Sequence, residues 1–256
     1  MEKYYIKSED WKKIYAFLKT RQDVRVGNED KTRTFGEAVY FIMRTGAQWR
    51  ELPVYYGKWR SVHKRFEQWS HKGLWNHVLI HFTEGYDGES VMIDSTIIRA
   101  HPCAAGYEKD QNARECLGRS KGGFTNKIHM VVDGLGQALR FSLTTGQRHD
   151  ITQASTLLQG FEYANIIADK GYDSNALIDQ IQEQNCIPVI PCRSNRKIPR
   201  EYDEHLYKER HLVECFFNKI KHFRRIFSRF DKKASSFAGF LAYASFILWL
   251  RKVHTT

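Results

Sequence analysis

The first third of the chain repeats its apolar residues at helical spacing. Trp11, Ile14 and Leu18 lie three or four positions apart, and the same spacing returns over residues 35–43 and 60–72. This periodicity is typical of amphipathic helices that bury one face. Residues 46–57, which contain a proline, interrupt the pattern between the second and third segments. Residues 1–85 therefore predict a small all-α domain of three helices.

The pattern changes after residue 89, where short apolar runs replace the helical spacing. Five runs are typical of buried strands and lie at residues 91–98, 127–132, 138–144, 165–168 and 186–191. An Asp-Gly turn at residues 133–136 favours a hairpin between the second and third of them. Helices are expected over residues 151–158, 174–184 and 206–225, and we expect Asp150 to cap the first. Residues 86–256 thus predict an α/β domain, a mixed five-stranded sheet flanked by helices in the ribonuclease H-like order.

Residues 238–250 are almost wholly apolar. Because a helix needs about 20 residues to cross a bilayer, this shorter run predicts a buried core helix and no membrane association. Residues 1–9 lack an apolar signal core, and the five cysteines are odd in number and form no Cys-x-x-Cys pair. We therefore expect a cytoplasmic protein with neither a disulfide framework nor a structural zinc site.

Charge is distributed unevenly along this chain of net charge +11. Residues 1–85 carry 16 Lys and Arg against 10 Asp and Glu, residues 86–191 carry 9 against 13, and residues 192–256 carry 15 against 6. Basic flanks suit a polyanion and an acidic middle suits a divalent cation, although scattered solvated charge is the alternative. The third N-terminal segment, with Lys64 and Arg65, fits a helix-turn-helix-like DNA reader or a helical bundle with a solvated basic face.

Two aspartates stand in or directly after apolar strands. Asp94 is flanked by Val-Met-Ile and Ile-Ile runs, and Asp169 follows Ile-Ile-Ala just before Gly171. An ionised carboxylate in a buried strand is costly unless it is paired or binds a metal. Strand ends are also where sites gather in open α/β sheets. Taken singly, each aspartate is equally compatible with a strand-end residue that caps a turn.

The helix expected over residues 206–225 has two distinct faces. Tyr207, Arg210, Glu214 and Lys221 fall within about 60° of arc at the α-helical 100° per residue. The apolar residues, among them Val213, fall on the opposite side. One face is thus expected to pack on the core while the other presents a row of Tyr, Arg, Glu and Lys. The same pattern also fits an ordinary helix with a solvated i,i+4 ion pair.

This row resembles the Y-R-E-K signature of DDE transposases of bacterial insertion sequences, in the insertion sequence four and five superfamily, insertion sequence five group. Four further segments resemble that group in its own order: residues 44–53 (RTGAQWRELP), 92–96 (MIDST), 118–129 (GRSKGGFTNKIH) and 168–173 (ADKGYD). The first is similar to the helical leader domain, and the second and fourth to the strands of the first two catalytic aspartates. The resemblance covers nearly the whole chain.

The resemblance implies a catalytic and metal-binding triad of Asp94, Asp169 and Glu214. It also implies two Mg²⁺ ions, for which Mn²⁺ is expected to substitute, because hard cations take carboxylate oxygens. Water would first free a 3′-hydroxyl at the end of the element, and that hydroxyl would then attack target DNA. The residues expected to contact DNA are Tyr207, Arg210, Lys221, Lys170, Lys64 and Arg65.

The implied partners are the terminal inverted repeats of the element and its target DNA, bound by a homodimer or higher multimer in the bacterial nucleoid. Two alternatives stay open: a ribonuclease H-like nuclease without strand transfer, and a catalytically silent DNA-binding protein derived from a transposase. Family members with a large insertion before the Glu helix clamp DNA with it, but residues 193–204 here are only short and basic. We expect them to form a basic loop near the DNA.

Overall fold

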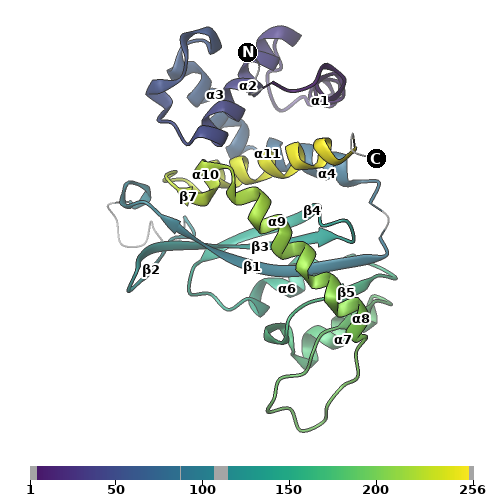
Figure 1. Cartoon of the computed structure of the whole chain (residues 1–256). Helices are drawn as coiled ribbons and strands as arrows, with labels where there is room; N and C mark the ends of the chain where they lie inside the picture. Colours follow the sequence, from purple (N-terminus) through teal and green to yellow (C-terminus); the bar gives the residue numbers. More distant parts are fainter. Residues whose placement is uncertain (1–4, 87, 107–114, 254–256) are drawn as a thin grey trace. The chain divides into compact units, whose positions relative to one another are not determined.

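Figure 1 shows the computed structural model, which describes residues 5–86, 88–106 and 115–253. The chain divides into two compact units. The helical unit comprises residues 1–82 and 220–256, and the sheet unit comprises residues 83–219. The division near residue 83 lies close to the boundary expected from the sequence. Residues 220–256, which the sequence pattern assigned to the second domain, group instead with the N-terminal helices.

The helical unit contains the three expected N-terminal helices and three more. Their bounds are α1 Ser8–Thr20, α2 Glu29–Thr45, α3 Trp59–His71, α4 Leu74–Thr83, α10 Arg224–Phe227 and α11 Ala234–Val253. Asn28 caps α2 by accepting hydrogen bonds from the amides of Asp30 and Lys31. The core is aromatic: the ring of Phe240 on α11 lies 4.3 Å from that of Phe66 on α3 and 6.1 Å from that of Trp49. Aromatic packing between distant segments explains why α11 joins the N-terminal helices.

The apolar C-terminal run forms a longer helix than its sequence pattern predicts. α11 is 20 residues long, and residues Ala234–Arg251 are apolar enough, by length and composition alone, to cross a membrane. However, 67% of this stretch is buried inside the structure. Burial of this extent is what a core helix requires, which agrees with the expected role of the segment.

The sheet unit contains all five expected strands and one short addition. The strands are β1 Ser90–Ala100, β2 Gly118–Ser120, β3 Gly123–Asp133, β4 Ala138–Thr145, β5 Asn165–Ile167 and β6 Ile187–Val189. Their order is β2-β3-β1-β5-β6, and β4 also pairs with β3. β1 is antiparallel to β3 and parallel to β5, and β5 is parallel to β6. This mixed sheet flanked by helices confirms the fold class expected from the sequence.

Helices cover both faces of the sheet. α6 Ile151–Leu158 and α7 Asn175–Glu183 share one apolar cluster with Ile93 and Val131. α9 His211–Lys221 crosses the opposite face (Figure 1). Because successive strand residues point to opposite faces, Asp94 is directed away from the α6 and α7 layer, toward the face that α9 covers.

Two local expectations were wrong. The helix expected over residues 206–225 is broken into α8 Glu204–Tyr207, a 3₁₀ turn at Lys208–Arg210, then α9 and α10. α9 ends because Phe223 adopts an extended backbone, which places its buried ring 6.4 Å from that of Tyr40. Asp150 does not cap α6. Its carboxylate accepts hydrogen bonds from Lys127 and Ser95, both at 2.8 Å, because these strand residues need an acceptor.

The α2 C-terminus offers a test of the helical unit. Gly46 has a φ of 69°, and a Cβ added there would lie 2.9 Å from Cβ of Arg224. Gly73 has a similar φ of 65°, but a Cβ there would meet nothing within 4 Å. We predict that Gly73→Ala lowers the free energy of unfolding by about 1 kcal/mol through backbone strain alone. Gly46→Ala should lower it by about 2–3 kcal/mol, because a close contact adds to that strain.

Urea denaturation of the two single variants measures this difference. Equal losses of stability would contradict the packing of Arg224 on the end of α2.

Candidate active site

Asp94 lies in the interior strand of the sheet. Its three preceding residues, Val91, Met92 and Ile93, are fully buried, and its own side chain is 18% exposed. Burial raises the pKa of Asp94 to about 6, helped by the negative charges of Asp169 and Glu214 and opposed by the Ser95 amide and Arg210. An ionised Asp94 is therefore costly in this position, and positive charge close to it would relieve that cost.

Asp169 is brought to the same edge of the sheet by strand register. β1 and β5 run parallel, with Met92 opposite Ile167. Asp94 lies two residues after Met92, and Asp169 lies two residues after Ile167. The two carboxylates therefore leave the sheet at the same level. Oδ1 of Asp169 accepts a 2.7 Å hydrogen bond from the amide of Gly171, in the 3₁₀ turn Lys170–Tyr172.

Glu214 comes from the helix that covers this face. The guanidinium of Arg210 links it to β1: Nη1 donates to Oδ2 of Asp94 at 3.0 Å, and Nη2 donates to Oε1 of Glu214 at 2.5 Å. Val213 and Phe216 on α9 are buried, as the helical pattern predicts, so the polar face of the helix is turned toward the carboxylates. Two carboxylates, from β1 and α9, thus bond to one guanidinium, and the negative charge of Asp169 at the end of β5 also acts on Asp94.

The donor set is suited to a hard divalent cation. Carboxylates are acceptors only, and Mg²⁺ and Mn²⁺ prefer oxygen ligands. Within the described parts of the chain, no three His, Cys, Asp or Glu side chains are already close enough to enclose a metal ion. Arg210 supplies the reason, because it takes one oxygen each of Asp94 and Glu214. The residues fit a metal by chemistry and charge once this guanidinium releases them.

The other residues named from the sequence lie in different surroundings. Tyr207 ends α8 half-buried, with its ring 5.5 Å from that of Tyr202. Lys170 is exposed directly after Asp169. Lys221 closes α9 and belongs to the helical unit, as do Lys64 and Arg65 on α3. The structure therefore brings Arg210 to the carboxylates, and a DNA contact by the remaining residues stays a prediction.

A second charged cluster, which sequence reasoning missed, supports the turn after Asp169. The buried carboxylate of Asp173 accepts hydrogen bonds from Arg196 at 2.7 and 2.9 Å, from Arg200, and from the amide of Arg193 at 2.9 Å. Burial pushes the pKa of Asp173 upward, but these donors hold it well below its usual range. The Arg193 guanidinium donates to the carbonyl oxygens of Lys170 at 3.2 Å and Gly171 at 2.7 Å.

This cluster ties residues 193–200 to the turn that carries Asp169. The sequence pattern predicts the same arginines as a loop near DNA, whereas in the structure Arg193 and Arg196 bond within the chain. β5 and β6 are parallel neighbours, so the segments after them meet at one sheet edge. This topology is the signal from which the cluster could have been predicted, because an Asp follows one strand and an Arg-rich run follows the next.

Comparisons with known proteins identify the family of the chain. Residues 86–249 match the family model described as "Transposase DDE domain", and residues 6–79 match that described as "Putative transposase of IS4/5 family". The chain is 42% identical over 132 residues to a "Putative transposase for insertion sequence element IS6501" of Brucella ovis, covering 50% of this chain and 99% of that protein. It is 29% identical over 128 residues to the IS402 counterpart of Burkholderia cepacia, covering 45% and 58%.

Among solved structures, the fold is similar to that of the piggyBac transposase in a synaptic complex with hairpin DNA. The TM-score is 0.54 at 15% identity, covering 96% of this chain and 72% of that chain, a likeness of fold alone. The family match, in contrast, spans residues 86–249, a range that includes Asp94, Asp169 and Glu214. The chain therefore belongs to the DDE-domain transposases of bacterial insertion sequences.

Proposed function

We propose that this transposase cleaves DNA at the ends of its insertion sequence and joins the freed 3′-ends to target DNA. One observation carries the proposal: Asp94, Asp169 and Glu214 come from three separate elements, and burial, together with the negative charges of Asp169 and Glu214, raises the pKa of Asp94. Such a concentration of like charge is unfavourable for folding alone, and perturbed pKa values of this kind mark functional sites.

In this proposal the three carboxylates hold divalent cations, Mg²⁺ in the cell and Mn²⁺ as a substitute. When bound, such ions supply Lewis acidity at the scissile phosphate and lower the pKa of the attacking hydroxyl group. Asp94 and Asp169 leave the sheet at one level, so they can share one ion. Glu214 would reach the ions from α9, the helix that covers this face of the sheet.

Arg210 has two roles in this proposal. Its guanidinium balances part of the charge of Asp94 and Glu214. With the carboxylates bound to a cation, the fork of N–H donors would be free to hold a phosphate of the DNA near the scissile bond. Tyr207, Lys221 and Lys170 are proposed to bind neighbouring phosphates. We further propose a multimer on paired ends in the bacterial cytoplasm, as the synaptic complex of the structural neighbour suggests.

The first prediction concerns both chemical steps. With labelled DNA that carries the element's own end, Mg²⁺ should support nicking and a joined product, and EDTA should abolish both. Glu214→Gln should lower both rates on the order of a thousandfold, because several kcal/mol of transition-state stabilisation are lost. Nicking without joining would favour a ribonuclease H-like nuclease. Tight binding without any cleavage would favour a silent DNA-binding protein.

The second prediction concerns the stability cost of the site. The pKa of Asp94 rises from 3.8 to about 6 on folding. As pH rises from about 4 to 6, the unfolded chain therefore loses this proton first, and ionisation favours unfolding. In EDTA at pH 7.5, Asp94→Asn should stabilise the protein by about 1–3 kcal/mol, at about 1.4 kcal/mol per pKa unit. The gain should shrink below pH 5.

Thermal melts across this pH range measure the effect, with the exposed Asp179→Asn on α7 as a control of equal charge change. Mg²⁺ should stabilise wild type and not Asp94→Asn. A loss of stability in Asp94→Asn at pH 7.5 would contradict the buried-charge account.

The third prediction separates positioning from DNA binding in residues 193–200. Arg196→Ala removes two hydrogen bonds to Asp173, whereas the adjacent Lys197 is exposed and makes no such bond in the described structure. Arg196→Ala should lower the cleavage rate about tenfold at unchanged DNA affinity, since a misplaced ligand typically costs 10- to 100-fold. The Gly171 amide, which holds Asp169, should exchange its hydrogen faster.

Lys197→Ala should change neither the cleavage rate nor the hydrogen exchange of the Gly171 amide. If both variants lose DNA affinity equally and Gly171 exchange is unchanged, residues 193–200 are a DNA-contacting loop instead.

A further inference from the structure

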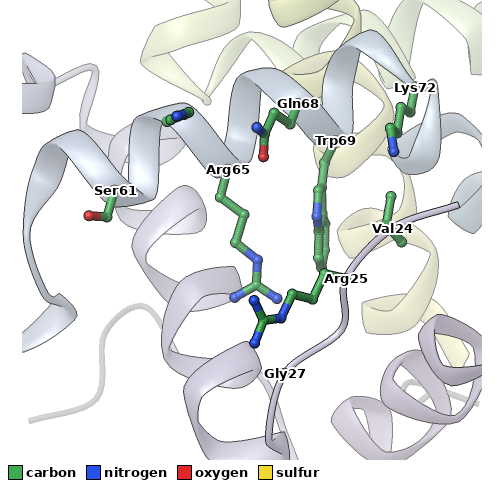
Figure 2. A pocket seen from close by; sticks show the side chains of 9 residues that line it. Val24, Arg25, Gly27, Ser61, Arg65, Gln68, Trp69 and Lys72 are labelled. Carbon is green, nitrogen blue, oxygen red and sulfur yellow. The ribbon is translucent and has the colours of Figure 1, made fainter.

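The helical unit contains a basic pocket away from the carboxylate site. It has a volume of about 560 Å³ and lies between the loop after α1 and one face of α3 (Figure 2). Four of its lining residues are cations, Arg25, Lys64, Arg65 and Lys72, and none of those that line it in the described structure is acidic. A hollow whose charged lining residues are all cations is electrostatically incomplete, and an anion would complete it.

The pocket is held open by interactions of its own. The hydroxyl of Tyr15 on α1 donates to the carbonyl of Gly27 at 3.1 Å. The ammonium of Lys72 donates to the carbonyl of Asp23, whose carboxylate pairs with Arg21 at 2.9 Å. These bonds fix both ends of the loop. The pocket therefore exists before any ligand binds, which lowers the entropic cost of binding.

Arg65 is fixed in the pocket wall by aromatic rings. Its guanidinium carbon lies 4.3 Å from the centre of the Phe35 ring and 4.6 Å from that of Trp69. Burial lowers the pKa of Arg65, and its guanidinium donates a long hydrogen bond of 3.4 Å to the hydroxyl of Thr32. Figure 2 shows the Arg25 and Arg65 side chains directed into the same part of the pocket. In the described structure, Arg25 and Lys64 have no acidic partner.

The shape of this site decides which part of DNA it can take. Base edges lie at the floor of a groove roughly 8.5 Å deep, and a protruding helix or loop is needed to reach them. Phosphates project from the outer surface of the duplex, where a concave site can receive them. The cations of this pocket line a hollow, so they are suited to a phosphate and poorly suited to a base edge.

We propose that this pocket is a sequence-independent seat for a DNA backbone phosphate, so that α3 positions the duplex rather than reads its bases. The inference rests on the proposed DNA-processing function and deepens it. Arg25 and Arg65 would grip the phosphate oxygens through their N–H donors, while Lys64 adds charge at the exposed rim. Inorganic phosphate shares this chemistry, so the test has to distinguish it from DNA.

The test uses Arg25→Gln and Lys64→Gln, which remove exposed charges and should leave the melting temperature unchanged. Arg65 is avoided because its ring contacts are part of the core. Lys12→Gln is the control, an equal charge change at an exposed α1 position outside the pocket. Fluorescence anisotropy gives affinities for the element's own end and for an unrelated duplex between 50 and 200 mM salt.

Each pocket variant should bind both duplexes about three- to tenfold more weakly, by the same factor. Each salt slope should fall by about 0.9, the value for one lost phosphate contact. A loss confined to the element's end would show that α3 reads bases and would overturn the inference. Wild-type DNA affinity in both variants, with weaker binding of inorganic phosphate alone, would overturn it in favour of a small-anion site.

These failures are distinct from failure of the proposed function. If wild type cleaves its element's end with Mg²⁺ while both pocket variants bind DNA normally, only the inference fails. If wild type binds neither duplex, the proposed function fails and the inference fails with it.

Discussion

The structure depends on how negative charge is accommodated at the carboxyl edge of a buried sheet. Parallel pairing of β1 with β5 sets Asp94 and Asp169 at one level. The two residues stay at this level for as long as the backbone register is kept. α9 then adds Glu214 to the same place. Arg210 balances part of this charge by bonding Asp94 and Glu214 together. A protein that needed only stability would place an apolar residue at position 94, so the buried charge fits the proposed role of Asp94 in holding a cation.

The support of this site is also electrostatic, and it uses a second cluster in which positive charge exceeds negative charge. Asp173 is saturated by donors from Arg193, Arg196 and Arg200, so it is a structural anchor and is not available to a metal. Asp94 and Asp173 thus have opposite environments: the pKa of Asp94 is raised by burial, and that of Asp173 is lowered by its arginine donors. This contrast separates the proposed catalytic carboxylates from the structural one.

Sequence patterns predicted the strands, because buried apolar runs are local properties of the chain. The triad was implied by the family resemblance, and its catalytic role stays a prediction. Sequence patterns could not predict the Asp173 cluster, since it joins segments that only strand order brings together. Nor could they predict that α9 ends before Phe223 or that α11 packs on Trp49 and Phe66, because aromatic partners far along the chain decide both. Arg65 was expected to contact DNA or to lie on a solvated basic face, and the sequence could not predict that its guanidinium lies over Phe35 and Trp69 at the wall of a pocket.

The most direct measurement of the central claim is anomalous diffraction from crystals of the protein soaked in Mn²⁺. The account predicts an anomalous peak bound by Asp94 and Asp169, with Glu214 within reach of the same site, and the Arg210 guanidinium moved off Asp94. Such a map would show that the guanidinium holds the place of a cation. A map with no peak at these carboxylates, and with Arg210 still bonded to both Asp94 and Glu214 at saturating Mn²⁺, would contradict it.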